Sequence, residues 1–310
     1  MIGIFGANGF IGTHLTRRLA LAGASVRAVS RRFDESFVEE FNGKVELIQA
    51  DLRRPIETAP ALYGLHTVVQ LISTSTPALM NEHILADLEE NVLPHVEFIQ
   101  NCLRADVKRY VFLSSGGTIY GPNADIPTPE THPTNPINSH GLTKLVVEKY
   151  IQMHGHVDGL GYLILRLANP FGRGQRFRKG QGLVAAVLEQ YRKRLPVQIY
   201  GDGSARRDYI YIDDVIDAIV AALGLDGAPR LIVNIGSGTT KTVVEVIDAI
   251  EEATGYHFER QHLPARETDV AISRLDISKA RDLLGWKPRT PFSQGIANTV
   301  AALDPQAPGR

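Results

Sequence analysis

The chain opens with three glycines spaced three residues apart, and this pattern constrains its fold more than any other feature. Ile2–Phe5 is a short apolar run typical of a buried strand, and Gly6, Gly9 and Gly12 follow it at once. The stretch Phe10–Leu21 then carries apolar residues at helical spacing. A strand, a glycine turn and a helix in this order present the N-terminus of the helix to a phosphate group. The sequence therefore predicts a turn that binds the diphosphate of a dinucleotide. The alternative is an ordinary glycine-rich turn between a strand and a helix.

The composition is that of a globular protein without a bias toward nucleic acids or membranes. Among the 310 residues 44% are hydrophobic and 22% are charged, and the formal net charge is −1. We therefore expect no nucleic-acid partner and no membrane partner, and no apolar run approaches the length of a membrane span. Cys102 is the single cysteine, so no intrachain disulfide is possible. A reducing, cytoplasmic location is expected because no signal peptide precedes the first strand. No metal site is predicted.

The end of the second expected strand bears on which dinucleotide is bound. This strand covers residues 24–29 and is followed by Ser30, Arg31 and Arg32, with Asp34 slightly later. In dinucleotide folds an acidic residue near this strand end holds the ribose 2′-hydroxyl, whereas an arginine accommodates a 2′-phosphate. The two arginines favour NADP. Because exposed arginines are also common as solvated surface charges, NAD remains open.

Further strands alternate with helices along the first half of the chain. This regular alternation predicts an α/β fold of the Rossmann type, with a doubly wound parallel sheet and right-handed crossovers. Polar residues that follow the strands then line a ligand crevice at the carboxyl edge of the sheet. The expected strands are 24–29, 45–49, 67–72, 109–113 and 160–167, and the expected helices include one long helix over 81–104 and another over 139–153.

The pattern becomes less regular in the second half, which predicts a smaller mixed α/β domain that binds the substrate. We assign residues 1–168 and about 209–237 to the dinucleotide-binding domain. Residues 169–208 and 238–304 form the second domain, and 305–310 are expected to fray. The expected elements are helices over 183–194, 213–223 and 243–254, strands over 197–200 and 231–235, an extended run over 207–211, and a short strand near Phe258.

A set of motifs along the whole chain resembles the extended short-chain dehydrogenase/reductase superfamily. More narrowly, it is similar to the NAD-dependent epimerase/dehydratase family, which includes UDP-glucose 4-epimerases. The motifs that carry the resemblance are Gly6/Gly9/Gly12, Ser114-Ser115 ahead of Thr118–Gly121, Gly141 with Lys144, Arg166–Pro170, Gly201–Gly203, Arg207–Tyr209, Arg266 with Asp269, and Asp276–Ala280 ahead of Leu284–Trp286.

The resemblance implies bound NAD, a nucleotide-diphosphate sugar as substrate, and a homodimer formed through the helices over 81–104 and 139–153. It implies that Lys144 binds the nicotinamide ribose and lowers the pKa of a catalytic neighbour. The residues expected at the cofactor are Gly6, Asn8, Gly9, Phe10, Ile11, Gly12, Ser30, Arg31, Arg32, Asp51, Leu52, Leu71, Ser73, Asn91 and Lys144. The residues expected at the substrate are Ser75, Asn169, Tyr200, Arg207 and Arg266.

The arginines in that set have a physical reason to contact the sugar nucleotide. A guanidinium group matches phosphate oxygens with two parallel hydrogen bonds, and two arginines neutralise a diphosphate. Arg207 and Arg266 are therefore expected at the diphosphate, with surface salt bridges as the alternative. Tyr200 precedes a Gly-Asp-Gly turn, where its ring is expected either on the nucleotide base or in the core.

Two positions depart from the family where the chemistry takes place. The family has a tyrosine four residues before the lysine, and this chain has His140 there. The family also places a Ser or Thr where this chain has Gly116. An imidazole with an ordinary pKa of about 6.5 is a suitable base, but it reaches less far from the backbone than a phenol. We expect His140 and Lys144 to be catalytic, with Thr118 or Ser115, Ser75, or a water in the space beside Gly116, bridging the remaining distance.

Three functions follow from these observations. The first is a nucleotide-sugar 4-epimerase that works through a transient 4-keto sugar with bound NAD(P). The second is an NADP-dependent keto-sugar reductase. The third is a catalytically impaired protein that binds the nucleotide sugar and NAD(P), because both family hydroxyls are replaced, by His140 and by Gly116.

Overall fold

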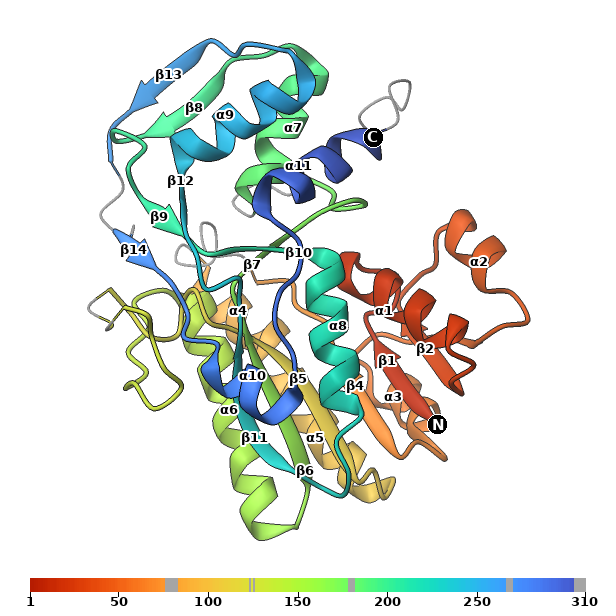
Figure 1. Cartoon of the computed structure of the whole chain (residues 1–310). Coiled ribbons are helices and arrows are strands. Elements are labelled where there is room, and N and C mark those ends of the chain that lie inside the picture. Colours follow the sequence, from red (N-terminus) through yellow and green to blue (C-terminus); the bar gives the residue numbers. More distant parts are fainter. Residues whose placement is uncertain (76–82, 123, 125, 178–181, 266–269, 304–310) are drawn as a thin grey trace.

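The computed structural model describes residues 1–75, 83–122, 124, 126–177, 182–265 and 270–303. A seven-stranded parallel sheet forms the larger part of the molecule, and smaller sheets lie above its carboxyl edge in the view of Figure 1. The strand order is β3-β2-β1-β4-β5-β6-β11. The chain adds strands outward from β1 to β3 and then crosses to the other side of β1 to add β4 and the later strands. This change of side is typical of a Rossmann fold and confirms the predicted fold class.

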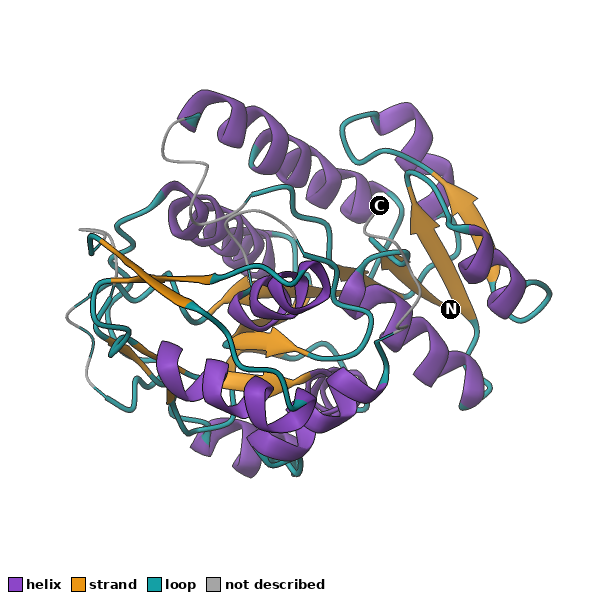
Figure 2. Ribbon diagram, turned by 90° about the horizontal axis from the view of Figure 1, so that it is seen from above, coloured by secondary structure: helices purple, strands orange, loops and turns teal. Residues whose placement is uncertain are grey.

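Mostly apolar strands form this sheet. The strands are β1 (Ile2–Phe5), β2 (Val26–Ser30), β3 (Glu46–Gln49), β4 (Thr67–Gln70), β5 (Arg109–Ser115), β6 (Gly161–Leu167) and β11 (Arg230–Ile235). The helices around it are α1 (Phe10–Leu21), α2 (Glu35–Phe41), α3 (Pro55–Leu62), α4 (Ile84–Asn91), α5 (Leu93–Arg104), α6 (Ser139–Val157) and α8 (Ile212–Leu223). Helices cover both faces of the strands (Figure 2), which explains why the strands are apolar on both sides.

Successive residues of a strand point to opposite faces of the sheet and pack in two separate hydrophobic cores. Ile4 packs in the cluster that includes α1 and α8, whereas Phe5 packs in the cluster with α5 and α6. In β5 the same alternation sends Val111 to the first core and Phe112 to the second. Both faces of the sheet are therefore sealed, and ligands have access only at its edges.

The later part of the chain builds the smaller sheets. Among the described residues they form three sheets: β10 pairs with β7, β9 pairs with β12 and β14, and β13 pairs with β8. Their strands are β7 (Asn169–Phe171), β8 (Val197–Tyr200), β9 (Arg206–Arg207), β10 (Tyr209–Tyr211), β12 (Lys241–Thr242), β13 (Arg260–Leu263) and β14 (Ile272–Ser273). The accompanying helices are α7 (Leu183–Lys193), α9 (Val243–Thr254), α10 (Ser278–Leu284) and α11 (Phe292–Ala301).

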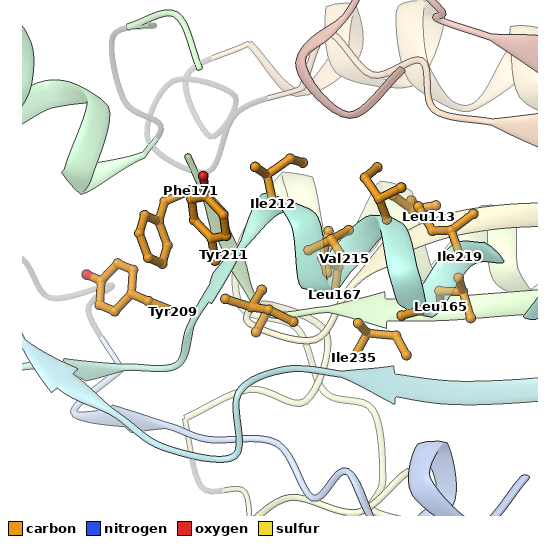
Figure 3. Close-up of a cluster of buried hydrophobic side chains, with 14 of the residues drawn as sticks. Leu113, Leu165, Leu167, Phe171, Tyr209, Tyr211, Ile212, Val215, Ile219 and Ile235 are labelled. Carbon is orange, nitrogen blue, oxygen red and sulfur yellow. The ribbon is translucent and has the colours of Figure 1, made fainter. Parts of the chain in front are cut away.

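One aromatic group ties the smaller sheets to the large one. Phe171 of β7 and Tyr211 of β10 meet edge to face at 5.7 Å between ring centroids, beside Tyr209 (Figure 3). The same cluster continues along the side chains of α8, from Ile212 to Ile219, toward β5 and β6 (Figure 3). The two parts of the chain therefore share one hydrophobic core.

The single helix expected over 81–104 is wrong. The chain forms two helices there, α4 and α5, separated at Val92. Pro94 lies in the first turn of α5, where its missing N–H is tolerated, but it cannot donate to a preceding turn. Asn91 therefore ends a helix instead of lying in the middle of one.

Two strand predictions also need correction. The extended run over 207–211 is divided into β9 and β10 by Asp208, whose buried carboxylate accepts hydrogen bonds from Ser237. The short strand expected near Phe258 lies slightly later, at β13, where it pairs with β8.

Among the residues that the structure describes, no helix is long and apolar enough to cross a membrane.

Candidate active site

The glycine turn has the shape that a diphosphate requires. Gly6 adopts a φ of +90°, which favours glycine. A Cβ at Gly12 would lie 2.7 Å from Ala7 Cα, so only glycine lets α1 approach the strand this closely. No described side chain caps the N-terminus of α1, which begins after Gly9. Its first N–H groups are therefore available to phosphate oxygens, and the turn fits the dinucleotide. The predicted Asn8, Phe10 and Ile11 lie in the same turn.

The edge beside this turn is rich in arginine. Arg31 and Arg32 are exposed after β2, which ends at the half-buried Ser30. The carboxylate of Asp51, which follows β3, is held by Arg53 at 2.8 Å. This ion pair keeps the pKa of Asp51 low, and the charge of Arg31 contributes to the same effect. The predicted Leu52 is buried next to it.

The second carboxylate near the end of β2 is also engaged. Asp34 accepts a hydrogen bond from Arg176 at 2.6 Å, and its backbone N–H donates to the side chain of Asn8 at 3.4 Å. The arginine belongs to the segment that follows β7. The structure thus brings a residue of the later half of the chain to the glycine turn.

The loop after β4 contributes two of the predicted cofactor residues, Leu71 and Ser73, and the third, Asn91, approaches it from the end of α4. Leu71 continues the hydrogen bonding of β4 by donating to the carbonyl of Phe5 at 2.9 Å. The Asn91 side chain accepts from the Thr74 backbone at 2.9 Å. Ser73 and Asn91 line a small cavity together with His95, Phe112, Thr143, Lys144 and Val147. The buried hydroxyl of Ser73 has no hydrogen-bond partner among the described residues, so the cavity side of this loop retains an unsatisfied polar group.

Lys144 lies between α6 and the carboxyl end of β5. Its ammonium group donates to the Leu113 carbonyl at 3.0 Å and lies 4.8 Å from the centroid of the Phe112 ring. The residue as a whole is half-buried, but its charged end is desolvated. Burial lowers the pKa of Lys144 to about 8, although Glu148 and Asp87 act in the opposite direction. Lys144 is therefore charged at neutral pH and close to its titration point.

His140 lies one helical turn before Lys144 and is only 7% exposed. Burial, and then the charge of Lys144, lower the pKa of His140 to about 3, while a hydrogen bond to the Ser75 backbone opposes them. The imidazole is therefore neutral at physiological pH. Its Nδ1 atom is buried and has no partner among the described residues.

The strand end opposite His140 offers hydroxyl groups, but Gly116 offers no space. Ser115 is half-buried at the end of β5, and the buried Thr118 hydroxyl has no partner in the described chain. A Cβ at Gly116 would lie 2.6 Å from Leu275 Cδ1. We expected the small residue at position 116 to leave room for a water. That expectation is wrong, because the Leu275 side chain fills the position.

The residues predicted to bind the substrate are less closely grouped. Asn169 begins β7 and donates from its side chain to the Asp208 carbonyl at 2.9 Å. Arg207 donates to the carbonyls of Arg206 and Val270. Arg266 itself lies outside the described residues, as does the tail over 305–310. Tyr200, at the end of β8, is 37% exposed.

Sequence reasoning missed two residues of this site. Asp87 of α4 is fully buried, and its carboxylate accepts from Ser75 at 3.2 Å and Ser139 at 2.6 Å. Leu275 fills the space at Gly116. A polar residue in an amphipathic helix normally faces solvent, so nothing in the local pattern distinguishes Asp87. Within the described part of the chain no cluster of His, Cys, Asp or Glu could hold a metal ion.

Comparison with known proteins identifies the family to which the chain is similar. Residues 2–236 match the model of the NAD dependent epimerase/dehydratase family. The UDP-glucose 4-epimerase of Mycolicibacterium smegmatis is 32% identical over 302 residues, covering 96% of each chain. Among solved structures, a UDP-glucose 4-epimerase from Thermotoga maritima with UDP-glucose has a TM-score of 0.90 at 30% identity and 97% coverage of both chains.

A second solved structure is that of the UDP-glucose 4-epimerase of Thermus thermophilus in complex with NAD. Its TM-score is 0.89 at 30% identity, and the alignment covers 97% of this chain and 98% of that one. The match of the family model over most of the chain agrees with the glycine turn and with the enclosed lysine. The chain therefore belongs to the NAD dependent epimerase/dehydratase family.

Proposed function

We propose that the protein is a nucleotide-sugar 4-epimerase that acts through a transient 4-keto sugar. The observation that carries the proposal is the buried Nδ1 of His140, which has no partner among the described residues and lies one turn from the enclosed ammonium group of Lys144. A buried polar atom without a partner is unfavourable unless a ligand completes it. The names of the relatives support the same reaction class.

The residues of this chain have distinct roles in the proposed reaction. The first turn of α1 binds the cofactor diphosphate, and Lys144 holds the nicotinamide ribose. A nicotinamide cofactor held there would supply the acceptor and donor of the hydride at C4 of the sugar. His140 accepts the proton of the sugar 4-hydroxyl, and Thr118 and Ser115 are the nearest hydroxyl groups on the opposite strand end.

The low proton affinity of His140 sets the expected rate. Burial and the charge of Lys144 lower the pKa of His140 to about 3. The imidazole is therefore a weaker base at pH 7 than an ordinary histidine, and forming the imidazolium slows the reaction. We therefore propose a slow epimerase, whose turnover rises when the base at position 140 has a higher proton affinity.

A second candidate is a protein that binds the nucleotide sugar without converting it. The specific observation in its favour is that Leu275 occupies the space next to Gly116. The family hydroxyl is absent there, and the structure has filled the position with an aliphatic side chain. Binding then depends on the glycine turn and the arginines, which are independent of positions 116 and 140.

NADP is the cofactor that we propose, although the family model names NAD. Both carboxylates near the ribose end of the turn are held by arginines, Asp51 by Arg53 and Asp34 by Arg176. Arg31 and Arg32 add two exposed positive charges. This environment favours a 2′-phosphate over a 2′-hydroxyl. An exchangeable NADP would also make the keto-sugar reductase a candidate to be tested alongside the epimerase.

We further propose a homodimer through α4 and α6. These helices contact one another and expose Ile84, Leu85, Leu142, Met153 and Val157, each at least 45% exposed. Large apolar side chains gathered on neighbouring helices are typical of a protein interface, and a second copy of the chain would cover them.

The deciding experiment follows C4 inversion by NMR. Purified protein is incubated with UDP-glucose, UDP-galactose, UDP-GlcNAc or UDP-GalNAc, with and without added NADP or NAD. Interconversion of one gluco/galacto pair without net cofactor turnover supports the epimerase. Binding detected by calorimetry with no inversion in any pair would support the second candidate. Stoichiometric oxidation of NADPH with a keto sugar would support the reductase.

A further inference from the structure

The α4 residue Asp87 is a buried carboxylate that the proposed reaction does not use. It has no accessible surface, and no Lys or Arg nitrogen lies within 4 Å of it among the described residues. Burying a carboxylate is unfavourable unless hydrogen bonds or charges compensate it. Core packing alone therefore does not account for a carboxylate at this position.

Three side chains donate to this carboxylate. Its Oδ2 atom accepts from Ser75 Oγ at 3.2 Å and from Ser139 Oγ at 2.6 Å. Its Oδ1 atom accepts from Asn91 Nδ2 at 2.9 Å. The orientation of the Asn91 amide is fixed because its oxygen accepts from the Thr74 backbone at 2.9 Å. Asp87 thus connects the loop after β4, the end of α4 and the start of α6.

These donors lie on both sides of His140. Ser139 is its neighbour in the chain, at the first position of α6. Ser75 hydrogen-bonds the His140 ring through its backbone. A single carboxylate oxygen therefore fixes the two residues that set where the imidazole lies. Because small displacements of a reacting group lower rates strongly, this constraint has functional weight.

The charge of Asp87 also acts on Lys144. The groups that influence the pKa of Lys144 are Glu148, on its own helix, and Asp87 on α4, both of which raise it. Glu148 is already paired with the buried Arg166 at 2.8 Å. Asp87 has no such cation, so its field is not cancelled locally. His140 and His95 face Lys144 as neutral groups, since burial and Lys144 lower the pKa of each to about 3.

We propose that Asp87 is a positioning residue of the candidate active site, which braces Ser75 and Ser139 around His140 by accepting a hydrogen bond from each hydroxyl. This inference rests on the proposed function for its biological meaning. Its physical content, the ring geometry of His140, is measurable without turnover.

The test compares Asp87→Asn with Glu90→Gln in the full chain. The first substitution keeps the shape of the side chain and removes its charge. The second removes an exposed carboxylate one turn later on α4, which among the described residues accepts a side-chain hydrogen bond from Thr74 Oγ1 at 3.0 Å. Lysine labelled with ¹³C at Cε reports the titration of Lys144, assigned with Lys144→Met, and ¹⁵N-histidine spectra report the His140 ring.

We expect Asp87→Asn to lower the titration midpoint of Lys144 by about one pH unit and to change the His140 ring signals. Glu90→Gln should leave both readouts as in the wild type. An Asp87→Asn protein that is folded, with unchanged ring signals, would overturn the inference. Ser75→Ala and Ser139→Ala provide the same test if Asp87→Asn does not fold, because each removes one brace, and unchanged ring signals in both variants would overturn it equally.

These measurements remain valid if no C4 inversion is found. In that case the altered ring signals would still support the role of Asp87, and the epimerase proposal alone would fail. If inversion is found, Asp87→Asn should lower kcat above pH 7 and leave KM for the nucleotide sugar unchanged.

Discussion

Leu275 occupies the position that a side chain at residue 116 would need. A Cβ built on Gly116 lies 2.6 Å from Leu275 Cδ1 and 3.0 Å from the Arg166 carbonyl. The family hydroxyl therefore cannot be added at residue 116 without moving the end of the Leu275 side chain.

Gly116→Ser should destabilise the protein by about 1 to 3 kcal/mol, since the added Cβ overpacks a closed site. Leu275→Ala should be destabilising by itself because it leaves a cavity. In the double variant the serine fills part of that cavity, so the two effects should not add. Denaturation midpoints of the wild type, the two single variants and the double variant give a double-mutant cycle. If the two losses of stability simply add, residues 116 and 275 do not compete for space.

His140→Tyr should raise turnover if the rate is limited by the length of the side chain at position 140 and by its proton affinity. A phenol extends further than an imidazole, and its proton affinity is high enough for it to accept the proton when Lys144 is adjacent. Steady-state rates with the active nucleotide-sugar pair measure the effect, with His140→Phe as the variant that has no base. If tyrosine abolishes activity and the wild type is active, the site depends on the imidazole.

The two buried histidines predict a loss of stability in acid. His140 and His95 each have a pKa of about 3 in the folded protein, below the unfolded value of about 6.5. Between these values the unfolded chain binds more protons, so stability falls as pH falls from 6.5 toward 3. From pH 7 to pH 5 each histidine should contribute about 2 kcal/mol to this loss.

Urea denaturation at pH 7 and pH 5 measures the loss. His95→Phe should flatten the pH dependence, even if its stability at pH 7 is lower because the bond to the Ile72 carbonyl is lost. His66→Phe is the matched control, because His66 is an exposed histidine. An unchanged slope in His95→Phe would contradict the low pKa.

Cofactor preference depends on the arginines after β2. Arg31→Ala with Arg32→Ala should weaken NADPH binding by at least about tenfold, because each lost phosphate contact is a charge-assisted bond. NADH binding should change little. Fluorescence titration gives both dissociation constants. Ser30→Asp is the converse variant and should favour NADH, and equal losses for the two cofactors would indicate a structural effect of the arginines.

The exposed apolar side chains of α4 and α6 predict an interface. Leu142→Glu should convert a dimer into a monomer, because it places a charge among Leu85, Met153 and their neighbours. Light scattering after gel filtration measures the mass. Leu21→Glu is the control, since Leu21 is 82% exposed at the end of α1. A wild-type chain that is monomeric at high concentration would refute the proposed dimer.

The sequence by itself determined the doubly wound sheet. Strand and helix periodicity and the spacing of Gly6, Gly9 and Gly12 are local properties, and local geometry decides them. The resemblance to the family, carried by motifs along the chain, singled out Lys144 and the replacement at His140, because a motif records which residue stands at a given distance along the chain.

The tertiary structure decided what surrounds those residues. The break at Val92, the brace made by Asp87 and the filling of the Gly116 site by Leu275 each depend on segments far apart in the chain. Burial then lowers the pKa of His140 to about 3, where the sequence suggested an ordinary imidazole. Desolvation and packing depend on all the neighbours of a group in space. Those neighbours come from distant parts of the chain, so the local sequence does not identify them.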